Sequence, residues 1–193
     1  MLLLDVDGPL NPFAAPPHKR PWGYATHRLK PDTWTAQHPD VPERLVKPLR
    51  VWLSPDHGPR LLTLPFDLVW ATTWEHDANE WIGWRIGLPR EHDYPVIEFG
   101  DQHVIRPDGT YFKTHTIVEY AAGRPFAWVD DQLTDVDRAY VAEHHRGRAL
   151  LHWVDPAKGL TDTDFTALAD WAAASEPTRT ERTPDDHQTQ ARP

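Results

Sequence analysis

The sequence contains no cysteine. This absence excludes disulfide bonds, zinc sites with thiolate ligands and cysteine nucleophiles, although it leaves the redox compartment undetermined. Twelve histidines are present, but none follows the HExxH spacing or a comparable pattern that would predict a zinc site. Any catalytic chemistry must therefore come from oxygen or imidazole groups.

Basic residues are also few. Lys and Arg number 20 against 29 Asp and Glu, which gives a formal net charge of -9 at pH 7. This charge repels a phosphate backbone unless basic side chains cluster locally, so nucleic acid is possible but not favoured as a partner. The hydrophobic share of 39% and the charged share of 25% are ordinary for a globular protein, and 193 residues fit one domain.

The apolar run at the start of the chain is short. Residues 1–4 are apolar, but Asp5 and Asp7 interrupt the run before it could form a signal peptide or a membrane-spanning helix. We therefore expect a cytoplasmic protein with no membrane partner. Residues 176–193 are rich in Thr, Pro, Gln and charge, which predicts a disordered tail after a single domain of residues 1–175. Nothing in the sequence indicates an oligomeric state.

Short apolar runs alternate with helical patterns along the chain. This alternation predicts an α/β fold, namely a doubly wound, mostly parallel, five-stranded Rossmann-like sheet. The predicted strands are residues 1–7, 67–72, 95–99, 126–130 and 150–154, and the predicted helices are residues 54–64, 74–86, 114–122, 136–145 and 162–174. Residues 11–53 are rich in Pro and Trp without a clear period, so we expect a small irregular insertion or minimal cap there.

Polar side chains gather where the predicted strands end, which is where ligands bind in an open sheet of this kind. They are Asp5 and Asp7 after the first strand, Thr72 and Thr73 at the second, Asp130 and Asp131 at the fourth, and Lys113 before the helix that leads into the fourth. This order resembles the four motifs of the haloacid dehalogenase (HAD) superfamily: DxD, Thr or Ser, Lys, and an acidic pair. The resemblance covers residues 1 to about 160.

The HAD resemblance implies a Mg2+-dependent phosphatase with an aspartyl-phosphate intermediate. Asp5 would be the nucleophile and Asp7 the general acid and base, with Thr72 and Lys113 at the phosphoryl group. Within the family, the second Asp is typical of phosphatases and phosphotransferases, whereas dehalogenases lack it. Independently of the resemblance, alternate strand residues point to one side, so Asp5 and Asp7 can converge, and clustered carboxylates favour Mg2+. The predicted metal ligands are Asp5, Asp7, Asp130 and Asp131.

Several assignments stay open at this level. Thr72 is favoured over Thr73 as the catalytic contact, with Thr73 as a substrate-binding residue, but Thr72 also fits a capping box with Glu75. Arg106 or Arg124 could replace Lys113 at the phosphate. Either Asp130 or Asp131 could be the direct metal ligand, with Asp130 favoured.

The substrate is the least constrained part of the prediction. Trp22, Trp34 and Trp52 lie in or beside the insertion, where they could stack on a ring of the substrate, although structural packing is the more common role of such residues. We expect a small phosphorylated metabolite or a nucleotide. The alternatives are a nucleic-acid end as the substrate, or a non-catalytic phosphate-binding module of HAD-like fold.

Overall fold

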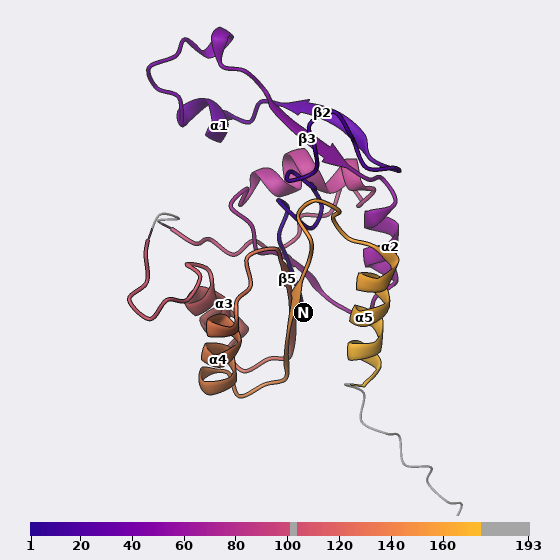
Figure 1. Ribbon diagram of the computed structural model, residues 1–193, viewed down its shortest axis with the longest axis vertical. Helices are drawn as coiled ribbons and strands as arrows, with labels where there is room; N and C mark the ends of the chain where they lie inside the picture. Colours follow the sequence, from indigo (N-terminus) through magenta and orange to yellow (C-terminus); the bar gives the residue numbers. More distant parts are fainter. Residues whose placement is uncertain (101–103, 175–193) are drawn as a thin grey trace, which may run out of the picture.

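The computed structural model describes residues 1–100 and 104–174, and its centre is a four-stranded parallel sheet (Figure 1). The strands follow the spatial order β4-β1-β5-β6. Their bounds are β1 Leu2–Leu4, β4 Leu68–Trp70, β5 Phe126–Asp130 and β6 Ala149–Trp153. Each run is mostly apolar, and β1, β4 and β5 are buried throughout, as expected for parallel strands covered on both faces.

Helices cover both faces of this sheet. Figure 1 shows α2 (His57–Thr63) and α5 (Asp162–Ala173) on one side, with α3 (Thr114–Ala121) and α4 (Asp135–His144) on the other. The alternation of side chains along β1 explains the two layers of core. Leu2 and Leu4 belong to the cluster that includes α2 and α5, whereas Leu3 belongs to the cluster that includes α3 and α4. This α/β architecture is compatible with a Rossmann-like fold.

The prediction of a fifth strand at residues 95–99 is wrong. The segment forms only an isolated parallel bridge between Trp70 and Val96, with hydrogen bonds from Trp70 N to Pro95 O (2.8 Å) and from Ile97 N to Trp70 O (2.9 Å). Pro95 has no N–H to donate, and β4 ends at Trp70, so the pairing cannot extend in either direction. The apolar character of residues 95–99 suggested a strand, but it did not show that β4, the partner strand, ends too early to pair with them.

The predicted helix over residues 74–86 is also wrong in type. Residues 72–76 form a bend and turns, and they are followed by the π-helix η2 (Ala78–Ile82) and the 3-10 helix η3 (Gly83–Ile86). Buried Ala78, Ile82 and Ile86 produced the apolar spacing that suggested an α-helix. Because the α-helical hydrogen-bond pattern is not maintained there, the segment winds more irregularly over the sheet.

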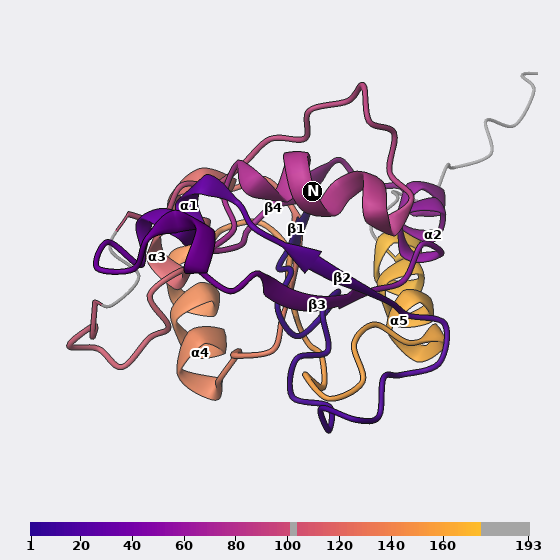
Figure 2. The same cartoon turned by 90° about the horizontal axis from the view of Figure 1, so that it is seen from above.

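The insertion of residues 11–53 is more regular than expected. It contains the antiparallel ribbon of β2 (Ala25–Leu29) and β3 (Leu49–Leu53), connected through α1 (Asp32–Ala36) and the 3-10 helix η1 (Glu43–Leu45). Seen from above in Figure 2, the ribbon lies across the end of the parallel sheet. Its inner side therefore faces the strand ends that carry the polar residues.

Two further predictions concern the tail and the membrane. The tail predicted at residues 176–193 lies outside the described residues. Among residues 1–100 and 104–174, no helix has the length and apolar character needed to cross a membrane.

His57 makes the stability of this fold sensitive to acid. The side chain is 4% exposed, packs against Tyr24 and Phe165, and leaves its Nδ1 atom without a hydrogen-bond partner. Burial, together with the nearby Arg60, lowers the pKa of His57 to about 4, from an ordinary value near 6.5. Since the unfolded chain binds the proton more tightly, the folded state loses stability as the pH falls from about 6.5 towards 4.

We expect this loss to reach at most about 3 kcal/mol, and His57→Phe to remove it. Urea unfolding of both proteins at several pH values between 4 and 7 measures the effect. An identical pH dependence in the two proteins would show that His57 does not cause it.

Candidate functional site

The topology of the sheet places one crevice at the carboxyl ends of β1 and β5. The chain passes from β1 to β4 on one side and then crosses to β5 on the other, so the two neighbours of β1 are reached in opposite directions. In open α/β sheets, ligands bind at such a switch point. Asp5 directly follows β1, and Asp130 is the last residue of β5.

Lys113 connects the two carboxylates of this crevice. Its Nζ atom lies 3.2 Å from Asp5 Oδ1 and 2.8 Å from Asp130 Oδ2, and it donates to the carbonyl of Ala71 at 3.0 Å. Lys113 and Asp130 have no exposed surface, and Asp5 is only 5% exposed. A buried charge requires compensation, and here one ammonium group shared by two carboxylates provides it.

The single positive charge of Lys113 offsets the two buried carboxylate charges only in part. Burial raises the pKa of Asp5 well above its ordinary range and outweighs the opposing effect of Lys113, while Asp130 and Asp7 raise it further. For Lys113, burial favours the neutral amine, but the charges of Asp130 and Asp5 outweigh burial and raise its pKa. Asp5 therefore needs more positive charge nearby before it can be fully ionised at neutral pH.

Three carboxylates of the site fit a divalent cation. Asp5, Asp130 and Asp131 each offer an oxygen, and these oxygens lie within 4.8 Å of one another. Burial, followed by the charge of Asp130, raises the pKa of Asp131 to about 6, so this side chain also favours a nearby cation. A set of carboxylate oxygens is the ligand type that Mg2+ prefers. The Asp7 carboxylate is not in this group and contacts other residues.

Gly8 makes room for this arrangement of carboxylates. Its φ of +95° lies in the left-handed region, and a Cβ atom built there would come within 2.6 Å of Asp131 Cβ and Cγ. A side chain at position 8 would push Asp131 away from Asp5. The glycine of the DxDG pattern therefore permits both the turn after β1 and the approach of the acidic pair.

Asp7 is held at both oxygens of its carboxylate. Asn11 Nδ2 donates to Oδ1 at 2.7 Å, and the indole Nε1 of Trp74 donates to Oδ2 at 2.9 Å. Neither Asn11 nor Trp74 was predicted from the sequence. The turn residues of Gly8-Pro9 indicate that the chain reverses after Asp7, which is a signal for Asn11, but the approach of Trp74 has no comparable signal.

The two threonines of the second strand end occupy different positions. Thr72 is fully buried and interacts with the Asp5 carboxyl group, and its Oγ1 accepts a hydrogen bond from the backbone N–H of Trp74 at 3.3 Å. The capping box proposed for Thr72 and Glu75 does not form, because a turn rather than an α-helix follows β4. Thr73 lines the cavity described below.

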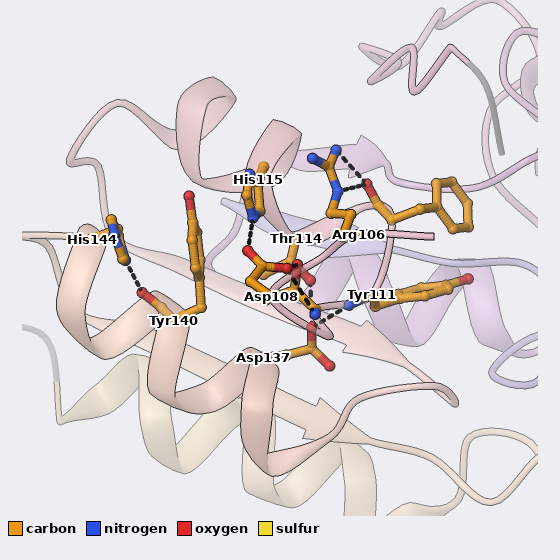
Figure 3. Close-up of polar contacts among 10 residues, drawn as sticks. Arg106, Asp108, Tyr111, Thr114, His115, Asp137, Tyr140 and His144 are labelled. Atoms are coloured by element: carbon orange, nitrogen blue, oxygen red, sulfur yellow. Dashed lines mark hydrogen bonds and ion pairs between the residues drawn. The ribbon is translucent and has the colours of Figure 1, made fainter. Parts of the chain in front are cut away.

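The loop that carries Lys113 is fixed to α4 by Asp137 (Figure 3). The buried Asp137 carboxylate accepts hydrogen bonds from Tyr111 N at 2.7 Å and Thr114 Oγ1 at 2.6 Å. It also forms the capping box of α4 with Thr134. The same side chain therefore caps α4 and holds the residues on both sides of Lys113.

The alternatives to Lys113 lie elsewhere. Arg106 donates to the carbonyl of Phe112 through Nε and Nη2, and Arg124 donates to the carbonyls of Ala121 and Tyr120. Neither arginine lines the cavity at the carboxylates. Lys113 is therefore the cation that the fold brings to the strand ends.

A cavity of about 500 Å3 opens in front of these residues. Asp5, Asp7, Lys113 and Asp131 form part of its wall on the side of the parallel sheet. The insertion forms the opposite wall with Pro31, Thr33, Trp34, Gln37, Leu49, Arg50 and Val51. The volume suits a small organic ligand, because such pockets typically measure about 300–1,000 Å3.

Of the three tryptophans predicted to contact substrate, only Trp34 lines this cavity. Its Nε1 atom donates to Lys47 O at 2.9 Å, which fixes the orientation of the ring. Trp22 is 98% exposed and does not reach the cavity. Trp52 is 3% exposed and packs with Ala15 and Tyr24, so it belongs to the interior of the insertion. Composition indicated aromatic anchors but did not distinguish these three environments.

Comparisons of the chain with protein-family models, with curated proteins and with solved structures found no match.

Proposed function

We propose that this protein is a Mg2+-dependent phosphomonoester hydrolase of HAD type that acts through an aspartyl-phosphate intermediate. The observation that carries the proposal is the position of Asp5. This carboxylate lines a cavity, contacts the buried Lys113 and shares a possible cation site with Asp130 and Asp131. Asp7, a second carboxylate that lines the same cavity, is available for proton transfer.

In the proposed first step, an oxygen of Asp5 attacks the phosphorus atom of the substrate. The bond from phosphorus to the leaving oxygen breaks, its electron pair stays on that oxygen, and Asp7 donates the proton that completes the alcohol product. In the second step, Asp7 takes a proton from water as the water oxygen attacks phosphorus. The bond between phosphorus and Asp5 then breaks, which releases phosphate and regenerates both carboxyl groups.

Positive charge near the reacting group has two sources in this proposal. Lys113 is held against Asp5 and can offset charge on the phosphoryl oxygens. Asp5, Asp130 and Asp131 would hold Mg2+, which when bound neutralises developing charge and keeps Asp5 ionised.

The proposed substrate is a small phosphorylated metabolite or a nucleotide. The cavity of about 500 Å3 accommodates a molecule of this size, and Trp34 in its wall offers a ring for stacking.

A phosphate-ester screen with and without metal tests the proposal. With Mg2+ we expect hydrolysis of a generic aryl phosphate, and with EDTA a loss of at least about 100-fold that added Mg2+ reverses. The release of phosphate is measured for both conditions. Turnover that is unaffected by EDTA would contradict the metal-dependent mechanism, and Mg2+-dependent phosphate binding without turnover would indicate a non-catalytic binding module instead.

A further inference from the structure

The Asp7 carboxylate has little freedom to turn. Its two oxygens each accept a hydrogen bond, one from Asn11 Nδ2 at 2.7 Å and the other from the Trp74 indole at 2.9 Å. A terminal carboxyl torsion is normally broad and two-fold, so a donor at each oxygen selects one orientation. Each carboxylate oxygen accepts more than one hydrogen bond, so both donors leave capacity for a proton or a substrate atom.

Asn11 reaches Asp7 because the chain folds back on itself after β1. The backbone N–H groups of Leu10 and Asn11 both donate to Val6 O, and the N–H of Gly8 donates to Asn11 O. Asp7 and Asn11 consequently pair as an isolated bridge. The Asn11 side chain is only 5% exposed, so its amide must find partners within the protein.

The second partner of Asn11 is the β2–β3 ribbon. Its Oδ1 atom accepts from the backbone N–H of Trp52 at 3.0 Å, and Trp52 is part of β3. Arg50 and Val51 of the same strand line the cavity. One amide side chain therefore joins the cavity wall formed by the ribbon to the carboxylate of Asp7.

We propose that Asn11 is a positioning residue that, together with the Trp74 indole, fixes the Asp7 carboxylate for proton transfer to the leaving group. This inference rests on the proposed function of Asp7 as the general acid. Asn11 acts through Asp7, and the hydrogen bond that it accepts from Trp52 N holds the ribbon in a fixed position relative to that carboxylate. If Asn11 only closed the turn after β1, its loss would slow all substrates equally.

The test compares two aryl phosphates that differ in leaving group. Phenyl phosphate needs a proton on its departing oxygen, whereas 2,4-dinitrophenyl phosphate releases a stable anion and needs little help. For Asn11→Ala we expect kcat/KM for phenyl phosphate to fall about 10- to 100-fold, and for dinitrophenyl phosphate less than about 3-fold, since general acid catalysis contributes at least 100-fold. The ratio kcat/KM is used because it covers only the steps up to departure of the leaving group.

Trp74→Phe tests the same carboxylate without touching the ribbon. This substitution keeps an aromatic ring but removes the indole donor to Asp7 and part of the ring volume, so we expect the same dependence on the leaving group. The matched control is Thr26→Val, which removes the acceptor of the Trp52 indole (3.0 Å) within the ribbon and leaves both donors to Asp7 in place. We expect Thr26→Val to change the two substrates by the same factor.

The outcomes separate this inference from the proposed function. Wild-type protein that hydrolyses neither ester with Mg2+ would overturn both. An active wild-type protein whose Asn11→Ala and Trp74→Phe variants, folded by circular dichroism, slow both esters equally would overturn only the inference. The inference would also be overturned if Thr26→Val showed the same leaving-group dependence as Asn11→Ala. A disturbed ribbon, rather than a misplaced Asp7, would then explain the dependence.

Discussion

Replacing Asp5 by Asn is expected to reduce phosphatase activity by at least about 1,000-fold, because an amide neither attacks phosphorus effectively nor balances a cation. The carboxylate contacts Lys113 and lies in the group of three that fits a divalent ion, so the substitution removes the nucleophile and a metal ligand together. Initial rates on an aryl phosphate with saturating Mg2+ measure the loss.

The change in Asp5→Asn is small in size, so a folded variant is expected. Asp162→Asn is the matched control, because it makes the same chemical change at an exposed side chain that pairs with Arg60. Wild-type protein quenched in acid during turnover should carry one phosphoryl group on the peptide that contains Asp5. Full activity of Asp5→Asn, or a phosphorylated peptide elsewhere in the chain, would rule out the proposed mechanism.

The approach of Asp5 to Asp130 could be predicted because one rule governs it. Parallel strands present their carboxyl ends at one edge, so Asp5 and Asp130 had to approach each other once β1 and β5 were neighbours. The position of Lys113 before α3 agreed with the motif order, and the structure brings its ammonium group to both carboxylates. These residues depend on the topology of the sheet more than on details of the loops.

The surroundings of the site could not be predicted in the same way. The contacts of Asp7 depend on how residues 6–11 turn back and on a turn that carries Trp74, and neither follows from periodicity. The same limit applies to the insertion. Trp22 and Trp34 look equivalent in the sequence, yet one is 98% exposed and the other lines the cavity.

The sheet itself shows a second limit. Residues 95–99 have the composition of a strand, but strand pairing needs a partner with free groups, and β4 offers only Trp70 at that point. The predicted helix after β4 failed for a related reason. Apolar residues at helical spacing are also compatible with π and 3-10 winding, so spacing identified the buried face of residues 78–86 but not its hydrogen bonding.

The largest expected effect on stability is that of Lys113→Met. Lys113 is fully buried and contacts Asp5 and Asp130, so its removal leaves two buried carboxylates without their cation. Breaking a buried ion pair by removing one partner typically costs about 3–5 kcal/mol. We expect a loss of this order in the free energy of unfolding at pH 7 without Mg2+, measured by urea denaturation.

The stability loss in Lys113→Met should depend on pH. Lys113 lowers the pKa of Asp5, so its removal raises that pKa further above the value in the unfolded chain. An acid whose pKa is raised on folding binds its proton more tightly in the folded state, so the variant should regain stability as the pH falls. Because the wild-type pKa of Asp5 is already about 8, the difference from wild type should be smaller at pH 7 than at pH 9.

Mg2+ provides the final comparison for Lys113→Met. A divalent ion at Asp5, Asp130 and Asp131 would compensate the same carboxylates, so Mg2+ should stabilise the variant more than it stabilises the wild type. Lys158→Met is the matched control, since Lys158 pairs with Asp155 while remaining 70% exposed, and its loss should change stability little at either pH. If Mg2+ stabilised neither protein, the three carboxylates would not form a cation site.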